Sequence, residues 1–493
     1  MISAHLPVLQ IVIPLMSAPL CVVIRNGKIV WGFAVAISWL AFACAIALTM
    51  QVMGHGPISY EIGNWPPPWG IEYHLDSVTV FMLLIVSGIG AITVFYARAS
   101  VQKEIPADRI YLFYTMYLLS MTGLLGIVIT GDAFNLFVFL EISALSSYVM
   151  ISLGSDKRAL TAAYRYLVMG TLGATFYIIG VGLMYMMTGT LNIADLAQRL
   201  PTVANTTTIL AALAFLTVGV SLKLALFPLH MWLPNAYTFA PSVVTVFLAS
   251  TATKVSVYVL MRVLFTMFGG VDVLDGMHVA EMLMALALVA MFAMSAVAIY
   301  QTNLKRMLAF SSLAQIGYMV LGISFVSVLG LTGGIIHLFN HAVMKGVLFM
   351  VMGCVMLRLG SVDIRDWSGI GRRMPWTMTA FVIAGLSMIG VPLTVGFVSK
   401  WYLVLAALET NAWWIAVLIL LSSLLAVFYI WRVVEVAWFR PVPEGAPPIQ
   451  EAPLSMLIPM YLLTAMTLFF GIDATLTTDI AGAAASFLLG GSS

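Results

Sequence analysis

The sequence predicts an all-α, polytopic membrane protein with about fourteen transmembrane helices. Hydrophobic residues make up 62% of the 493 positions and charged residues only 9%, whereas soluble proteins carry about 25% charged residues. Apolar runs of about 20 residues, the length that crosses a bilayer, recur along the whole chain. Basic residues gather in alternate loops between these runs. All three observations favour helices that cross a membrane repeatedly.

The first apolar run is predicted to be a retained helix, because the residues before it lack the basic region and small-residue cleavage site of a signal peptide. Residues 54–74 form a loop whose segment 64–70 is a Pro-rich turn, with two tryptophans suited to a membrane interface. The seventh and twelfth runs contain Pro228 and Pro392, which remove a backbone hydrogen bond and predict broken helices. The predicted spans are 4–24, 29–53, 75–97, 110–130, 133–153, 161–188, 207–239, 241–266, 278–300, 307–327, 330–357, 376–409, 412–438 and 453–472.

The distribution of basic residues predicts the orientation of the chain. Loops on the side reached after the first helix hold 16 of the 22 lysines and arginines, and the other side holds two, Arg199 and Arg262. Because cytoplasmic loops carry the excess of basic residues, both termini are predicted to lie outside a cell (inner) membrane. The remaining four are Lys223, Lys254, Lys345 and Lys400, all within predicted helices.

The positions of the helices indicate an internal repeat. The length of chain between Pro228 and Pro392 nearly equals the length between the starts of helices 4 and 9, near Ile110 and His278. Helices 4–8 and 9–13 therefore form two five-helix units, which are inverted relative to each other because five is odd. Interrupted helices at matching positions of inverted repeats mark the transport site of secondary transporters. The predicted segments are 1–109 (helices 1–3), 110–266 (first repeat), 278–440 (second repeat) and 441–493 (a C-terminal helix and tail).

Glu141 and Lys223 are predicted to form a proton-linked pair. Glu141 is the only acidic residue deep within a predicted helix, and Lys223 lies shortly before Pro228. A lysine at this depth costs about 2.5–3.5 kcal/mol, and each charge favours the charged form of the other. The alternative interpretation is a static buried ion pair that fixes helix register.

Further titratable residues extend this pair into a row. Lys254 and Lys400 lie in helices 8 and 12, and the alternative for each is an amine that extends to the membrane interface. His337, His341 and Lys345 follow one helical face at intervals of four residues, which suits a proton relay. The alternatives are hydrogen-bonded core histidines, or a zinc site that lacks a third ligand. His230, just after the break in helix 7, is either a proton donor to Lys223 or a packing residue.

Other motifs are missing from the sequence. There is no nucleotide-binding loop and no haem, iron–sulfur or flavin motif, so no cofactor is predicted and any redox chemistry belongs to a partner. The three cysteines lie in apolar segments without metal-ligand spacing, so no metal site is predicted. A net charge of +2 gives no indication of nucleic-acid binding.

These residues match a family over roughly residues 110–440. The deep Glu141, the Lys223 break followed by Phe-Pro-Leu-His-Met-Trp-Leu-Pro, Lys254, His-Leu-Phe-Asn-His-Ala-x-x-Lys, and the helix with Pro392 and Lys400 carry the match. The chain resembles the antiporter-like subunits of Mrp-type cation/proton antiporters, complex I and membrane-bound hydrogenases. The resemblance implies a hetero-oligomeric complex in the lipid membrane that exchanges protons for Na⁺ or K⁺. The alternatives are a proton-pumping subunit of a redox complex, or a structural subunit with a vestigial path.

Overall fold

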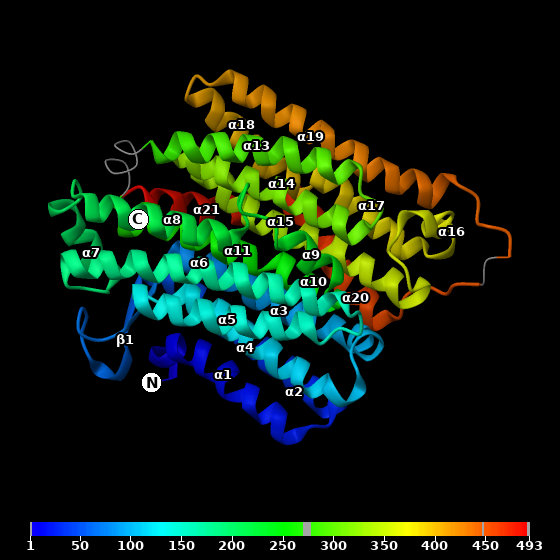
Figure 1. The fold of residues 1–493 in the computed structure, drawn as a ribbon, viewed down its shortest axis with the longest axis horizontal. Coiled ribbons are helices and arrows are strands. Elements are labelled where there is room, and N and C mark those ends of the chain that lie inside the picture. Colours follow the sequence, from blue (N-terminus) through cyan, green and yellow to red (C-terminus); the bar gives the residue numbers. More distant parts are fainter. Residues whose placement is uncertain (1, 270–277, 446–447, 491–493) are drawn as a thin grey trace.

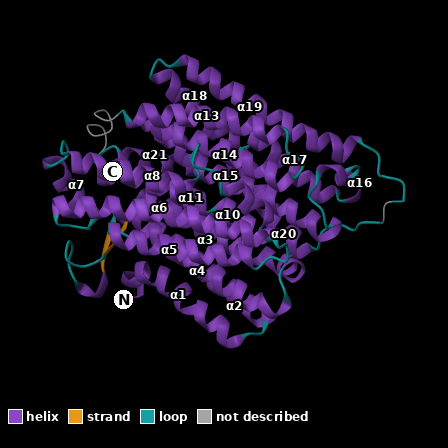
Figure 2. Cartoon of the chain, viewed as in Figure 1, coloured by secondary structure: helices purple, strands orange, loops and turns teal. Residues whose placement is uncertain are grey.

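The computed structural model describes residues 2–269, 278–445 and 448–490, and these are almost entirely helical (Figure 2). Among them are 13 helices long and apolar enough to cross a membrane. The predicted helix 12 is missing from that number because its two halves, α17 (Pro375–Ile389) and α18 (Val395–Glu409), have 15 residues each. When this broken helix is counted as one crossing, the predicted all-α fold with fourteen crossings is confirmed.

The N-terminal part contains a β-hairpin that the sequence pattern did not predict. The loop expected after the second helix holds two short antiparallel strands, in which Ile58 pairs with Leu75 and Glu61 with Glu72. The Pro-rich turn connects them, and the hairpin is the orange element of Figure 2. The elements are a 3₁₀ turn (Ile2–His5), α1 (Leu6–Ile24), α2 (Gly27–His55), β1 (Ile58–Glu61), a 3₁₀ turn (Ile62–Asn64), β2 (Glu72–Leu75), α3 (Ser77–Glu104) and a 3₁₀ turn (Ala107–Arg109).

Two groups of helices follow, and a short C-terminal part closes the chain. The first group is α4 (Ile110–Ile129), α5 (Ala133–Ser152), α6 (Arg158–Thr188), α7 (Ile193–Arg199), a 3₁₀ turn (Leu200–Thr202), α8 (Thr207–Leu224), α9 (Leu233–Phe239), α10 (Ser242–Ser250), α11 (Ala252–Met261) and a π-helical turn (Arg262–Met267). The second group and the C-terminal part are α13 (Val279–Ile299), α14 (Leu304–Ser324), α15 (Val328–Leu359), a 3₁₀ turn (Ile364–Trp367), α16 (Ile370–Arg373), α17, α18, α19 (Trp413–Val434), a π-helical turn (Glu435–Phe439), α20 (Leu454–Ile472) and α21 (Thr475–Leu488).

Two isolated β-bridges display the inverted repeat. Asp132 bridges Asn192 and Asn303 bridges Asp363, so both partners recur with the same separation along the chain. The first residue of each bridge caps a helix: Asp132 caps α5 and Asn303 caps α14. The first bridge lies at the end of the molecule that holds α7 and the hairpin, whereas the second lies near α16 at the other end (Figure 1). The same local structure therefore occurs upside down in the second group.

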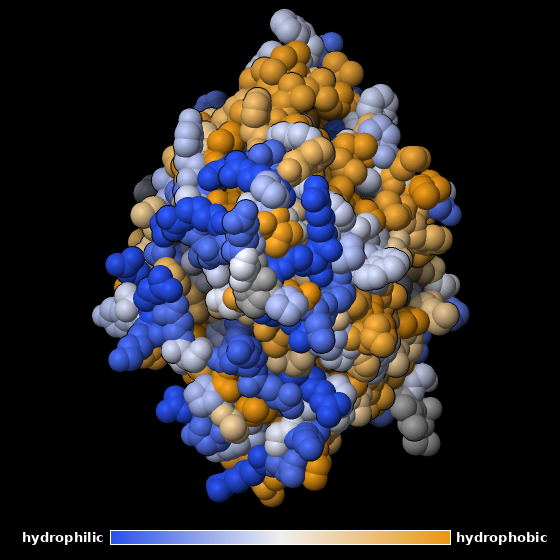
Figure 3. All heavy atoms as spheres, turned by 90° about the vertical axis from the view of Figure 1, so that its right-hand side faces the viewer, coloured by the Kyte–Doolittle hydropathy of each residue, from blue (hydrophilic) through white to orange (hydrophobic). Residues whose placement is uncertain are grey.

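The long helices run side by side, so their ends define two faces of the molecule (Figure 1). The hairpin face carries β1, β2, α7 and both labelled chain ends, and the opposite face carries α16 and the loop after α19. Hydrophilic residues gather on the opposite face, with apolar residues along its flanks (Figure 3). Residues 1 and 491–493 lie outside the described residues. The fold does not show which face lies outside the cell, so the placement of both termini there stays a prediction, as do the boundaries of the four segments.

Among the described residues, three helices are interrupted within the bundle, one more than predicted. Ala225 ends α8 and Gly390 ends α17 with φ values of 60° and 94°, in the left-handed region. The predicted continuous helix 241–266 is also divided, because Thr251 leaves the helical conformation with φ −126° and ψ −59°. Each interruption frees backbone carbonyls inside the bundle, where only polar partners satisfy them.

Candidate functional site

The structure brings Glu141 and Lys223 together as an ion pair. Lys223 Nζ donates to Glu141 Oε1 over 3.0 Å, and the exposed fractions of the lysine and glutamate side chains are 8% and 24%. Lys223 lies in the last turn of α8, immediately before the break, while Glu141 faces it from α5. The paired charges offset part of the desolvation cost that each would bear alone.

Aromatic side chains fix the break beside this pair. Trp232 Nε1 donates to the carbonyl of Leu222 over 2.9 Å, and the Tyr166 ring stacks on Trp232 at 3.9 Å between centroids. His230 stacks on Phe227, and among the described residues its Nδ1 has no hydrogen-bond partner. The structure thus places His230 in the broken segment but not in hydrogen-bond contact with Lys223, so its role as proton donor stays a prediction.

Lys254 is fully buried and binds the second interruption. Its ammonium donates to the carbonyl of Ala249 and lies 3.4 Å from Thr253 Oγ1, and Ala249 is one of the residues before the break at Thr251. The side chain turns back along its own helix and reaches no surface, so the interpretation as an interface-seeking amine is wrong. Within the described chain, no carboxylate forms an ion pair with Lys254.

The predicted row of His337, His341 and Lys345 on α15 is buried completely. His337 Nε2 lies 3.0 Å from Gln315 Oε1, which only accepts, so Nε2 donates, and Nδ1 lies 2.8 Å from Ser399 Oγ. The ring of His341 lies 6.1 Å from that of His337, and neither of its nitrogens has a hydrogen-bond partner among the described residues. Lys345 donates to the carbonyl of Leu308 over 3.1 Å and to Ser311 Oγ.

The two repeats meet at this row. Gly346, next to Lys345, packs against α10 so closely that a Cβ there would lie 3.3 Å from Ser250 Oγ. Ser250 is the last residue of α10, directly before the break that Lys254 binds. Lys254 of α11 and the row on α15 therefore face one shared, buried region. No third ligand joins the two histidines of α15 among the described residues.

Lys400 occupies the third break. Its ammonium donates to the carbonyls of Met388 and Ile389, each over 2.9 Å, at the C-terminal end of α17. The negative end of the helix dipole and the ring of Tyr318, 4.9 Å away, both favour a cation there. With an exposed fraction of 6%, Lys400 does not extend to the interface either. The residue before it in the chain, Ser399, contacts His337.

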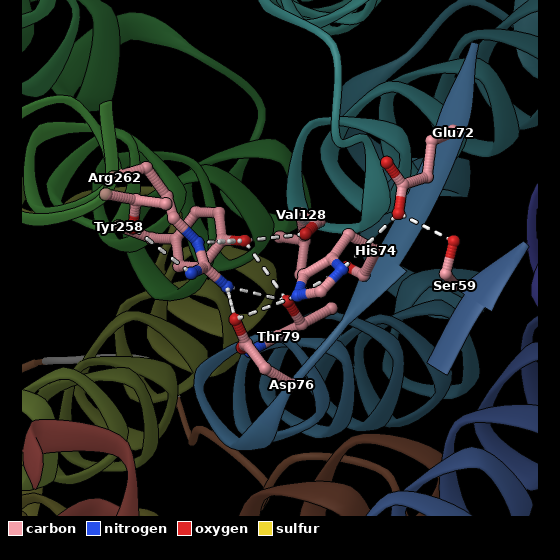
Figure 4. A network of polar contacts seen from close by, with 9 residues as sticks. Ser59, Glu72, His74, Asp76, Thr79, Val128, Tyr258 and Arg262 are labelled. Atoms are coloured by element: carbon pink, nitrogen blue, oxygen red, sulfur yellow. Dashed lines mark hydrogen bonds and ion pairs between the residues drawn. The ribbon is translucent and has the colours of Figure 1, made fainter. Parts of the chain in front are cut away.

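Two further buried ion pairs among the described residues were not predicted. Arg262, counted with the outer side at the end of the predicted span 241–266, has its Nη2 2.7 Å from Asp76 and donates through Nε to Tyr258 Oη over 2.9 Å (Figure 4). The signal in the sequence was the spacing of Lys254, Tyr258 and Arg262 at intervals of four residues along one helical face. Burial alone would raise the pKa of Asp76, but Arg262 and the Asp76 cap on α3 hold it below its usual range.

The second unpredicted pair lies at the opposite end of α3. Lys305, expected in a loop, is 2% exposed, and its ammonium lies 3.2 Å from the carbonyl of Ala240 and 3.9 Å from Glu104. Glu104 in turn accepts from the backbone and hydroxyl of Ser242. This pair joins α3, α10 and α14, so each end of α3 is tied to another helix by buried charges.

Acidification is expected to weaken the hairpin region through Glu72. Contact with His74 outweighs burial and, with hydrogen bonds from Ser59 and Asn192, lowers the pKa of Glu72 to about 2. A depressed pKa stabilises the fold above the unfolded value of 4.5, and this stability is lost as the pH falls from there towards 2. Glu72→Gln is expected to lower stability by about 1–3 kcal/mol at pH 7 and to flatten this acid dependence. Thermal unfolding at pH 7 and pH 3.5 measures both effects, and an unchanged acid slope would contradict the assignment.

Known proteins share this architecture. Residues 130–426 match the family described as NADH:quinone oxidoreductase/Mrp antiporter, transmembrane region. The chain is 42% identical to the NADH-quinone oxidoreductase subunit N of Desulforudis audaxviator, with 94% of each chain covered. It is 30% identical to the D subunit of the Na⁺/H⁺ antiporter of Alkalihalophilus pseudofirmus, over 95% of this chain and 94% of the other. A chain in the structure of the Mrp complex from Dietzia sp. DQ12-45-1b superposes with a TM-score of 0.90 at 25% identity, covering 99% of this chain and 98% of that one.

Proposed function

The chain belongs to the NADH:quinone oxidoreductase/Mrp antiporter family, and on that premise we propose that it is the proton-translocating subunit of a multisubunit Na⁺ or K⁺/proton antiporter. The observation that carries the proposal is the Glu141–Lys223 ion pair at a helix break, 3.0 Å between the charged atoms, in a chain whose α11, α15 and α18 also hold buried amines and imidazoles. Ionisable residues within a membrane are costly and mark ion pathways.

The row offers proton-binding atoms in a fixed order. When Glu141 moves away from Lys223, the ammonium loses its counter-charge and its proton becomes easier to release; when the pair closes again, the amine binds a proton more tightly. Lys254, His341 and Lys345 are the acceptors in the shared buried region, and none of them pairs with a carboxylate within the described chain. His337 then passes a proton between its two nitrogens, towards Ser399 and Lys400.

Within the family, the D subunit of an Mrp-type antiporter is the assignment that we propose. It agrees with Lys400, with the complete His337, His341 and Lys345 row, and with the likeness to the Na⁺/H⁺ antiporter relative and to the Mrp complex. Other membrane subunits would be the partners. The buried row holds amines and imidazoles and a single carboxylate, so this chain would carry protons, and Na⁺ or K⁺ would cross elsewhere in the complex. The hairpin face would be the outside, because basic loops gather at the opposite face.

A second candidate is a proton-pumping subunit of a redox complex. The relative from Desulforudis audaxviator, at 42% identity, carries the name of an NADH-quinone oxidoreductase subunit, which favours this candidate. The same row would then move protons, and a partner would supply the electron transfer. The chain itself would remain a transporter subunit in both cases.

Purification of the intact complex separates the two candidates. Partners without redox groups, together with Na⁺- or K⁺-driven proton movement in vesicles, would support the antiporter. Partners that hold iron–sulfur clusters or reduce a quinone would support the redox complex. A chain that purifies alone, without proton movement under either driving force, would contradict both.

A further inference from the structure

A cavity opens at the hairpin face, away from the row of lysines. Its volume is about 370 Å³, which is ample for several water molecules. Residues of β2, the connection between α4 and α5, α7, α11 and α21 line it, so the first repeat supplies most of its wall. Apart from the charged cluster described next, the lining is mainly apolar, for example Leu136, Ala197 and Phe487.

One wall of the cavity carries an alternating series of charges. His74 lies between two carboxylates: Nδ1 is 3.6 Å from Glu72 Oε1 and Nε2 is 3.9 Å from Asp76 Oδ2 (Figure 4). On the far side of Asp76 lies Arg262, which also contacts Thr79 Oγ1 and Tyr258. Among the residues that line the cavity, the titratable and charged groups are Glu72, His74, Asp76, Tyr258 and Arg262, and α7 and α21 add none.

His74 differs from its neighbours in its access to the cavity. Its side chain is 35% exposed, whereas Asp76 is fully buried and Arg262 is 6% exposed. Histidine titrates near neutral pH, and Arg262 stays charged throughout. A protonated His74 would therefore compete with Arg262 for the one carboxylate between them. The remaining groups already have their partners, because Glu72 accepts from Ser59 and Asn192, and Tyr258 donates to the carbonyl of Val128 over 2.7 Å.

We propose that this cavity is an outward proton site of the first repeat, in which His74 binds the proton and the Asp76–Arg262 pair separates the cavity from Lys254. The inference rests on the proposed function. Tyr258 and Arg262 follow Lys254 along α11 at intervals of four residues, so the pair lies about 12 Å from the lysine along the helix axis. Protonation of His74 draws Asp76 away from Arg262 and frees the guanidinium and Tyr258 to rearrange.

The first test replaces His74 in the intact complex, reconstituted in vesicles with the hairpin side outside. His74→Gln is expected to remove the dependence of the exchange rate on outer pH between about 5 and 8, and to leave the dependence on inner pH unchanged. His278→Gln is the matched control, because His278 is exposed and pairs with Glu281 by itself. An outer pH profile of His74→Gln that equals the wild-type profile would overturn the proposal.

The second test probes the cavity itself and uses a variant with intact charges. Ala197→Cys is expected to react with a positively charged, membrane-impermeant thiol reagent added outside, and the reaction to stop most of the exchange. The native cysteines are buried, so they need no replacement. Asn205→Cys, in the exposed connection between α7 and α8, is the control that reacts without loss of exchange. No reaction at Ala197→Cys, or a reaction that leaves the exchange rate unchanged, would overturn the proposal.

Wild-type exchange in the Lys223→Arg variant would instead refute the proposed function, independently of both tests.

Discussion

Lys223→Arg is expected to preserve the ion pair with Glu141 and yet reduce cation-coupled proton exchange by about tenfold or more, equivalent to ~1.4 kcal/mol or more in the barrier. Arginine keeps a positive charge beside Glu141, whose Oε1 lies 3.0 Å from the native Lys223 ammonium. Its guanidinium does not give up a proton in proteins, so it supports a static ion pair but not a relay. Exchange driven by a cation gradient in vesicles measures the effect.

This substitution separates the two interpretations of the pair. A static pair that only fixes helix register would tolerate arginine, and the assembled variant would then exchange at the wild-type rate. The matched control is Lys157→Arg, because Lys157 is an exposed lysine on the connection before α6. Assembly of both variants into the complex is verified on the same samples, so that a loss of exchange reports on the proton path.

Gly219→Leu is expected to destabilise the first repeat by about 3 kcal/mol and to deplete the assembled subunit. A Cβ at Gly219 would lie 2.7 Å from both the carbonyl oxygen of Gly173 and the amide nitrogen of Tyr177. These are backbone atoms of α6, which a side-chain adjustment does not move, so α8 must shift. Because Lys223 lies one turn further along α8, the shift would also separate it from Glu141. Thermal unfolding of the purified complex measures the loss.

The control for this prediction is Gly182→Leu. Gly182 belongs to the same helix, α6, and a Cβ there would meet no atom within 4 Å. The same added volume is therefore expected to leave stability within about 0.5 kcal/mol of the wild type. If both variants unfolded alike, the close approach of α6 and α8 would not be what positions Lys223.

Hydropathy and proline positions were sufficient to predict the helices and the inverted repeat. Apolar length alone gives a transmembrane helix, because no other structure satisfies the backbone in lipid. The matching positions of Pro228 and Pro392 indicated the same repeat that the bridges of Asp132 and Asn303 display. The break at Thr251 left no signal, since neither proline nor glycine interrupts that helix.

Buried charges were predicted where they lie inside an apolar run, and missed where they lie at the end of one. Lys305 lies in a predicted polar loop and Arg262 near the end of a predicted helix, yet as whole residues they are only 2% and 5% exposed. Their partners, Glu104 and Asp76, lie far away in the sequence, at the two ends of α3. A single sequence does not reveal which helix ends meet across the bundle, so these pairs needed the tertiary structure.

Proton flux through the complex with Lys400→Arg tests the central claim most directly, because Lys400 belongs to the second repeat and makes no contact with the Glu141–Lys223 pair of the first. The guanidinium still satisfies the carbonyls of Met388 and Ile389 but does not release a proton. A pH-sensitive dye enclosed in vesicles that contain the purified complex reports the flux. A path that runs through both repeats predicts that flux falls to the level of protein-free vesicles. Wild-type flux in a fully assembled variant would contradict it.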